Sequence, residues 1–299
     1  MRVARRKKEP DNSVIIAGVA PGHILILWFH HLVTNLPKRP EPYGLQTFAR
    51  RHHVKDVERS AALSIYRPMR QRVRICIIQS CYIPWKGFFD LLSRCDEYVV
   101  FDSAQYAKRH WHNRNRIKTA NGVEWLTIPV IVKGRFDQAI DQVEVEKPWA
   151  DKHWRAIELA YRRAVFFEQF APAVKGWYEQ AERQARLTDV NAIFLHGITK
   201  LLGINTRIVR DTVYPAQGIK TERLLGIARS AGADSYLTGP SARAYFDEGM
   251  FRSAGIKTEW MSYDGYPEYQ QLHGSFEHSV TALDLLFNAG PEAGRYLQH

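Results

Sequence analysis

Short runs rich in apolar and β-branched residues recur from about residue 73 onward and predict the strands of a sheet. The runs are 73–79, 97–102, 206–209, 235–238 and 256–262. Segments with helical periodicity stand between or after them, at 88–94, 221–231, 246–254 and 279–287. A strand, a helix and a strand within about thirty residues predict a βαβ unit, which places its strands parallel in one sheet.

A second pattern predicts an antiparallel hairpin. Asn121-Gly122 separates two further strand-like runs, 116–119 and 123–130. Asn-Gly is a strong hairpin signal because both residues tolerate the positive φ angles of a type I′ turn. The sheet is therefore expected to gain an antiparallel element, which disfavours a purely parallel Rossmann domain.

Residues 149–202 are expected to be helical. Apolar residues there recur at spacings of three and four, as in Trp149 to Tyr161 and Phe194 to Leu202. Thr188 or Asp189 is placed to cap the second of these helices. The predicted fold class is α/β, with a mixed, mostly parallel sheet, an antiparallel hairpin and a helical middle segment, in a single domain over 69–299.

Residues 1–68 lack such patterning and form a basic extension. Their apolar run, 14–29, is interrupted by Pro21 and falls short of the ~20 residues that a membrane-spanning helix needs. Three interpretations stay open: a non-native upstream extension with the natural start at Met69, a disordered basic arm, or a signal or membrane anchor. The abrupt onset of patterned sequence favours the first.

The distribution of charge changes the meaning of the formal net charge of +11. Residues 1–70 contain thirteen Lys and Arg against five Asp and Glu, so their net charge is +8 and that of the remaining chain is +3. The patterned part therefore lacks the charge of a dedicated polyanion binder, and nucleic acid is not the expected partner.

Composition narrows the class of protein further. A hydrophobic content of 45% is that of a globular chain rather than a disordered or polytopic membrane one. Three cysteines without a Cys-x-x-Cys pair indicate a reducing compartment, so a cytoplasmic protein is expected. No His/Cys cluster has metal-ligand spacing, and neither a Walker loop nor a Gly-x-Gly-x-x-Gly motif occurs, so a standard NTPase or dinucleotide site is disfavoured and the cofactor stays open.

Candidate chemistry gathers after the first two predicted strands. Ligands of open α/β sheets bind beyond the carboxyl ends of the strands, where Gln79 and Asp102 lie. The loop after Asp102 is dense in polar and aromatic residues. We predict catalytic roles for Asp102, His110 and Lys108. Substrate-binding roles are predicted for Gln79, Tyr82, Trp85, Gln105, Trp111, Asn113, Arg114, Asn115 and Ser241.

Each role has a chemical reason. Lys108 and Arg114 are suited to hold phosphate or to stabilise developing negative charge. His110 is suited to act as a general base, with Asp102 orienting it or binding a hydroxyl. Trp85 and Trp111 are suited either to stack a sugar or a base or to pack in the core.

Other interpretations of single residues stay open. Asn113 and Asn115 are suited to hold loop backbone through their side chains. Cys81 is an alternative nucleophile beside His110. The turn at 236–241, with Arg243, is either a second anion-binding loop or a tight turn after a strand.

Several of these motifs resemble the WbqC-like proteins over about residues 73–290. They include Gln79-Ser-Cys-Tyr-Ile-Pro-Trp85, Trp111-His-Asn-Arg-Asn115, Thr221-Glu-Arg-Leu-Leu225 and Tyr236-Leu-Thr-Gly-Pro-Ser241. The chain departs from the family pattern at Ile78, where His is usual, and at Ser80, where Pro is usual.

The resemblance implies a transferase of bacterial surface-polysaccharide or modified-sugar biosynthesis, with acyl or aminoacyl transfer to a sugar as one candidate reaction. It implies a sugar or nucleotide-sugar substrate and an acyl or aminoacyl carrier as partners. Two alternatives stay open: a nucleic-acid-binding module, and a non-catalytic assembly partner of polysaccharide enzymes.

Overall fold

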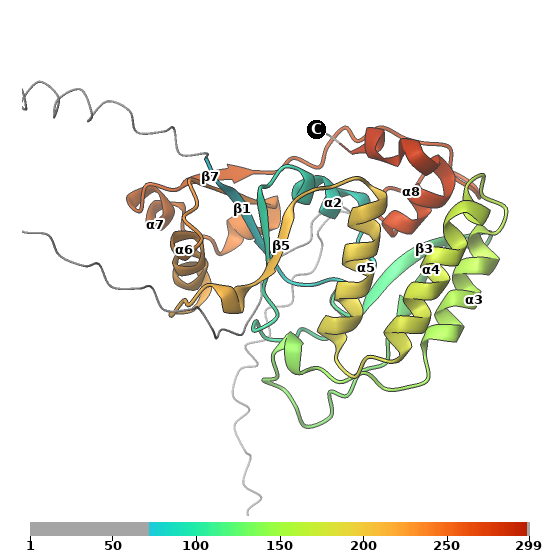
Figure 1. The fold of residues 1–299 in the computed structure, drawn as a ribbon, viewed down its shortest axis with the longest axis horizontal. Coiled ribbons are helices and arrows are strands. Elements are labelled where there is room, and N and C mark those ends of the chain that lie inside the picture. Colours follow the sequence, from blue (N-terminus) through green and yellow to red (C-terminus); the bar gives the residue numbers. More distant parts are fainter. Residues whose placement is uncertain (1–71, 298–299) are drawn as a thin grey trace, which may run out of the picture.

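The structure is a computed structural model that describes residues 72–297 (Figure 1). The basic extension over 1–68, its apolar run and the expected start at Met69 lie outside the described residues. Within the described part, no helix is both long and apolar enough to cross a bilayer.

A five-stranded parallel sheet forms the centre of the fold. Its order is β5-β2-β1-β6-β7, with every neighbouring pair parallel. The strands are β1 (Arg74–Ile78), β2 (Glu97–Val100), β5 (Arg207–Arg210), β6 (Ser235–Thr238) and β7 (Lys257–Trp260). The central strand β1 is buried from Ile75 to Ile78, which explains its nearly continuous apolar sequence. The predicted, mostly parallel sheet is confirmed.

The predicted hairpin is also present. Strands β3 (Arg114–Thr119) and β4 (Gly122–Thr127) pair antiparallel, and Gly122 has a φ of 106°. They form a two-stranded sheet of their own instead of extending the parallel one. Asn115 ties this hairpin to the turn after β1, because its Nδ2 donates to the carbonyls of Tyr82 (3.0 Å) and Ile83 (2.8 Å).

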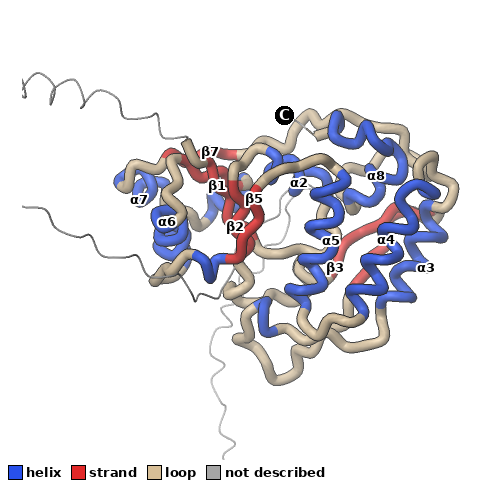
Figure 2. The backbone as a smooth tube through the Cα atoms, viewed as in Figure 1, coloured by secondary structure: helices blue, strands red, loops and turns tan. Residues whose placement is uncertain are grey.

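Helices flank the sheets at two ends of the molecule (Figures 1 and 2). The helical middle segment is confirmed as three helices that pack side by side, with α3 also against β3. They are α3 (Ala150–Tyr161), α4 (Phe167–Glu182) and α5 (Leu187–Leu201). The remaining helices are α2 (Lys86–Ser93), α6 (Lys220–Ser230), α7 (Glu248–Ser253) and α8 (Ala282–Ala289). Short 3-10 segments occur at Ile140–Gln142, Asp211–Val213, Pro240–Ala244 and Gly290–Tyr296.

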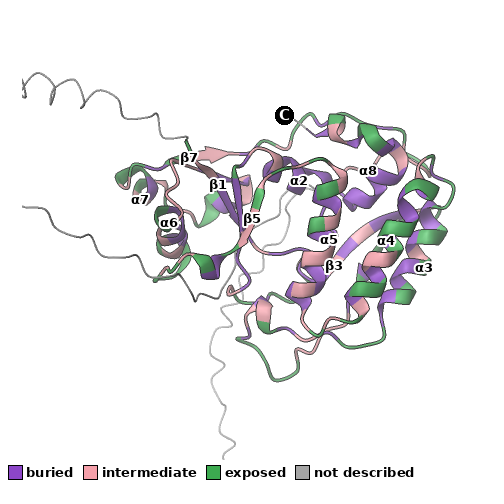
Figure 3. Ribbon diagram, viewed as in Figure 1, coloured by how far each residue is buried: buried purple, intermediate pink, exposed green. Residues whose placement is uncertain are grey.

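The core is continuous and rich in aromatic side chains, and Figure 3 shows β1 and much of β3 within it. Tyr82 illustrates how it is organised. Its ring is fully buried, and its hydroxyl lies 2.8 Å from His153 Nδ1 on α3 and 2.6 Å from the Tyr178 hydroxyl on α4. The turn after β1 is thereby joined to the helical middle segment.

Trp85 and Gly87 form the tightest contact in this turn. A Cβ at Gly87 would lie 2.3 Å from Cζ2 of the Trp85 indole. That indole packs edge-on against Tyr263 and Tyr266, with ring centroids 5.2 and 5.8 Å away. The start of α2 therefore requires glycine at this position.

Gly87→Ala is predicted to lower the free energy of unfolding by about 1–3 kcal/mol, because the added methyl group displaces the indole. The matched control is Gly176→Ala in α4, where an added Cβ meets no atom within 4 Å. That control is expected to raise the free energy by about 0.5–1 kcal/mol. Urea unfolding measures both variants, and effects of the same sign would contradict the prediction.

Candidate functional site

The candidate site begins with a buried carboxylate at the carboxyl end of β2. Asp102 has no exposed surface. Its Oδ1 accepts the Ser80 backbone N–H (3.0 Å), and its Oδ2 accepts the hydroxyls of Ser80 (2.8 Å) and Thr188. Burial raises the pKa of Asp102 to about 6, although these hydrogen bonds favour the charged form. Asp102 thus joins the ends of β1 and β2 to helix α5.

The network continues from Ser80 to the loop that precedes the hairpin. Asn191 Nδ2 donates to Ser80 Oγ and to the carbonyl of His112, both at 2.9 Å. His112 Nδ1 lies 3.2 Å from the Ser80 carbonyl, which only accepts, so this nitrogen carries the proton. The opposite nitrogen, Nε2, is buried without a partner in the described structure.

His110 stands beside His112, with ring centroids 4.5 Å apart. Its Nδ1 is buried and has no hydrogen-bond partner in the part of the chain described. Burial and the nearby Arg114 lower the pKa of His110 to about 4, while burial and His110 lower that of His112 to about 3. Both imidazoles are therefore neutral at physiological pH.

The expected contact between Asp102 and His110 is absent from the described hydrogen bonds. Asp102 acts instead through Ser80, whose hydroxyl and carbonyl contact Asn191 and His112. The expected helix cap is also different: α5 begins at Leu187, and the Thr188 hydroxyl is used by Asp102. Asp102 is therefore buried and held by these hydrogen bonds.

Arg114 provides positive charge next to the histidines. Its guanidinium carbon lies 4.1 Å from the ring centroid of Trp125, which is 44% exposed. Trp111 packs against Trp125 with ring centroids 5.2 Å apart, and Trp125 in turn holds the cation. Among residues 72–297, neither Arg114 nor Lys108 forms an ion pair with a carboxylate. Such free cations are suited to an anionic ligand.

Four other predicted residues lie at the surface or partly exposed. Gln79 is half-buried, and its side chain makes no hydrogen bond to any described residue. Gln105 and Lys108 both contact Phe136: Gln105 Nε2 donates to its carbonyl (3.0 Å), and Lys108 Nζ lies 5.2 Å from its ring. Ser241 is half-buried in the 3-10 turn after β6.

The remaining predicted substrate-binding residues are used inside the protein. Tyr82 and Trp85 belong to the core, with 0% and 8% of their surface exposed. Asn113 accepts from the Tyr106 hydroxyl (2.9 Å) and donates to the Ile128 carbonyl (2.8 Å). Asn115, buried likewise, holds the turn after β1. Both asparagines position the loop rather than face a ligand.

Cys81 is not arranged as a nucleophile. Its thiol is buried, and burial raises its pKa, with a further increase from Asp102. The thiol therefore stays protonated, and its hydrogen bond goes to the Gln79 carbonyl.

The structure adds polar residues that the sequence did not single out. Thr188 and Asn191 share one face of α5, and a pair of polar residues three apart on an apolar face was the available signal. At the end of β5, Asp211 lies 3.6 Å from Arg223, and Ser103 contacts both. Asp211 Oδ1 and Arg223 Nε are buried without hydrogen-bond partners in the described chain. Burial also raises the pKa of the Asp211 carboxyl.

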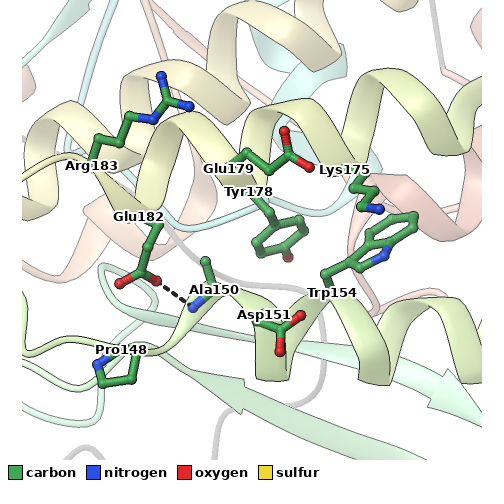
Figure 4. A pocket seen from close by; sticks show the side chains of 9 residues that line it. All are labelled: Pro148, Ala150, Asp151, Trp154, Lys175, Tyr178, Glu179, Glu182 and Arg183. Carbon is green, nitrogen blue, oxygen red and sulfur yellow. Dashed lines mark hydrogen bonds between the residues drawn. The ribbon is translucent and has the colours of Figure 1, made fainter.

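A separate cavity of about 400 Å³ opens between α3 and α4 (Figure 4). Trp154 and Tyr178 lie along its apolar side. Glu182 at its rim accepts from the backbone N–H groups of Trp149 (3.1 Å) and Ala150 (2.8 Å), so it caps the start of α3. Its residues come from the helical middle segment and include none of the predicted site residues.

Residues 72–297 contain no group of three or more His, Cys, Asp or Glu side chains placed to hold a metal ion. What the site can offer chemically is a neutral imidazole with a free nitrogen, unpaired cations and a half-buried amide. This set is suited to bind an anionic group and to accept a proton.

His112→Asn is predicted to flatten the dependence of stability on pH. Below pH 6.5 an unfolded histidine takes up a proton, whereas native His112, with a pKa of about 3, does not. The stability that His112 contributes is therefore present above about pH 6.5 and lost as the pH falls toward 3. The variant should remove about 1.4 kcal/mol per pH unit from this fall, as measured by urea unfolding at several pH values.

Asp102→Asn tests the opposite dependence of stability on pH in the same network. Native Asp102, with a pKa of about 6, keeps a proton that the unfolded carboxyl releases above its ordinary 3.8. It therefore adds stability as the pH falls from 6 to 3.8, and its removal should steepen the acid fall. An unchanged slope in H112N, or a shallower one in D102N, would contradict the assignment.

Comparison with known proteins places these motifs in a family. Residues 79–296 match the WbqC-like protein family. The chain is also 45% identical over 227 residues to "Uncharacterized protein Rv1507c" of Mycobacterium tuberculosis strain H37Rv, which covers 76% of this chain and 98% of that protein. No solved structure matches the chain significantly. The residues of the candidate site, from Gln79 to Arg223, lie within the matched region, and the chain belongs to the WbqC-like protein family.

Proposed function

We propose that the protein is a transferase of bacterial surface-polysaccharide or modified-sugar biosynthesis that uses an activated, anionic donor and a sugar acceptor. One observation carries the proposal: the Arg114 guanidinium, held on Trp125 and in no ion pair within the described chain, stands next to neutral His110. An anion-binding group and a proton acceptor side by side are what transfer from a phosphate- or thioester-activated donor requires.

In the proposed step, an acceptor hydroxyl attacks the electrophilic carbon of the donor, an acyl carbon or an anomeric carbon. The His110 imidazole takes the hydroxyl proton as the new C–O bond forms. The leaving group departs with the bonding electron pair, as a phosphate or a thiolate. Arg114 and Lys108 stabilise the charge that develops there.

The surrounding network supports this role of His110. His112 is fixed by Ser80 and Asn191, and it packs against His110. Because the His112 ring is neutral, the charge that acts on His110 is that of Arg114. This positive charge opposes protonation of His110. At neutral pH His110 is therefore in the neutral form that a general base needs, although a pKa of about 4 makes it a weaker base than an ordinary histidine. Nucleotide and thioester donors are cytoplasmic metabolites, and we propose that compartment for the reaction.

Arg114→Gln is predicted to weaken donor binding by about 10- to 100-fold, because one charge-assisted hydrogen bond to the anion is lost. Titration calorimetry with UDP-N-acetylglucosamine and with acetyl coenzyme A measures the effect and separates the two donor classes. The control is Arg155→Gln, since Arg155 is exposed on α3 and paired with Asp151. Equal binding by R114Q and wild type would refute the donor site.

His110→Gln is predicted to lower the transfer rate by about 100- to 10,000-fold while leaving donor affinity within about twofold. The rate is followed with a radiolabelled donor and a mixture of monosaccharide acceptors. His196→Gln, an exposed histidine on α5, is the matched control. Full transfer by H110Q would exclude His110 as the base.

The two alternatives predict different results for the same protein. A nucleic-acid module predicts binding of single-stranded RNA that weakens steeply with salt and depends on Arg114 and Arg116, whose guanidiniums lie near Trp125. A non-catalytic assembly partner predicts neither donor binding nor salt-sensitive RNA binding. Measured donor affinity that R114Q weakens would count against both.

A further inference from the structure

A second cavity, of about 550 Å³, opens beside the ends of β6 and β7. Arg243, Tyr245 and Phe246 of the segment after β6 line one part, and Trp260, the last residue of β7, lines another. The strands are parallel, so these ends lie at the same edge of the sheet as Gln79 and Asp102. The volume falls in the range of small-molecule sites.

Arg243 is the free charge of this cavity. Its guanidinium carbon lies 4.2 Å from the ring centroid of Trp260, and within the described residues it forms no ion pair. A guanidinium held over an indole ring stays at a defined place and keeps its charge. Arg243 on Trp260 repeats the arrangement of Arg114 on Trp125, which belong to the β3–β4 hairpin.

The two carboxylates of the cavity are already engaged. Asp247 Oδ1 accepts the backbone N–H groups of Gly249 (2.8 Å) and Met250 (3.2 Å). Glu248 accepts from Trp260 Nε1 at 2.5 Å and lies 3.9 Å from Arg252. Neither neutralises Arg243, so the cavity presents a cation that a ligand anion can pair with.

An aromatic surface accompanies this cation. Tyr245 is 46% exposed, an unusual exposure for a large aromatic side chain, and the next residue, Phe246, packs against Trp260 with ring centroids 5.8 Å apart. An exposed tyrosine ring beside a free guanidinium is suited to the apolar C–H face of a sugar ring that carries a negative group.

The cavity is connected to the candidate site through α6. The Thr221 hydroxyl donates to the Tyr245 carbonyl (3.5 Å) and accepts from the Asp247 N–H (3.3 Å). Two residues further along the same helix, Arg223 contacts Ser103 and Asp211 at the end of β5. Helix α6 therefore contacts both the cavity and the end of β5.

We propose that this cavity binds an anionic monosaccharide unit, with its carboxylate or phosphate on Arg243 and its ring on Tyr245. The inference deepens the proposed function, on which it rests for the role of this sugar as acceptor. Of the two interpretations of the turn at 236–241, which includes Ser241, the proposal favours the anion-binding one, because the turn is followed directly by Arg243.

Binding of glucuronate, glucose 6-phosphate and neutral glucose to the full chain tests the proposal. The indole ¹⁵N–¹H signal of Trp260, identified by its loss in Trp260→Phe, is expected to shift with one or both anionic sugars and not with glucose. Which anion acts distinguishes a carboxylate from a phosphate ligand. An equal response to glucose, or no response to either anion, would overturn the proposal.

Variants assign the contacts. Arg243→Gln is expected to weaken binding of the anionic sugar by about 10- to 100-fold, and the control Arg229→Gln, exposed on α6, to leave it unchanged. Because Arg243 also packs on Trp260, Tyr245→Ala provides a second variant at an exposed side chain. It is expected to weaken binding by about fivefold, and unchanged affinity in both would refute the site.

The failure of this inference and that of the proposed function are distinguishable. Arg114→Gln is expected to leave the affinity for the anionic sugar unchanged while it weakens donor binding. If wild type binds the anionic sugar but neither donor, the cavity stands and the donor site fails. If wild type binds a donor but no anionic sugar, the donor site stands and this inference is wrong.

Discussion

The buried carboxylate of Asp102 is the interaction on which the arrangement of the site depends. It receives hydrogen bonds from Ser80 and Thr188, and thereby connects β1, β2 and α5 at one point. A buried carboxylate without donors costs several kcal/mol, so these three elements are held in one relative position. Ser80 then passes this constraint to Asn191 and His112.

The network explains how the loop that carries His110 is held in one conformation. The segment between β2 and β3 has no regular structure, yet Asn113, Asn115 and His112 each hold backbone with their side chains. Their burial leaves His110, Lys108 and Arg114 as the groups that face outward or remain unpaired. Function in this proposal belongs to the few residues that the framework does not use.

Two arginines lie over tryptophan rings, one in the β3–β4 hairpin and one beside the end of β7. Arg114 on Trp125 and Arg243 on Trp260 lie 4.1 and 4.2 Å from the respective ring centroids. An indole face fixes a guanidinium without neutralising it, whereas a carboxylate would do both. The modest net charge of the patterned chain is compatible with this, because position, and not number, makes these cations available to a ligand.

The sequence by itself determined the elements. Alternating and helical periodicities over 73–299 located every strand and most helices, and Asn121-Gly122 located the hairpin, because these patterns follow from local backbone geometry. It also placed the polar loop around His110 at the edge of the sheet. Only the tertiary structure decided which polar residues meet. Thr188, Asn191 and Asp211 lie far along the chain from Asp102 and Ser103, and Tyr82 and Trp85 proved to be core. The reason is physical: burial and hydrogen-bond partners are set by long-range packing, which no local spacing encodes.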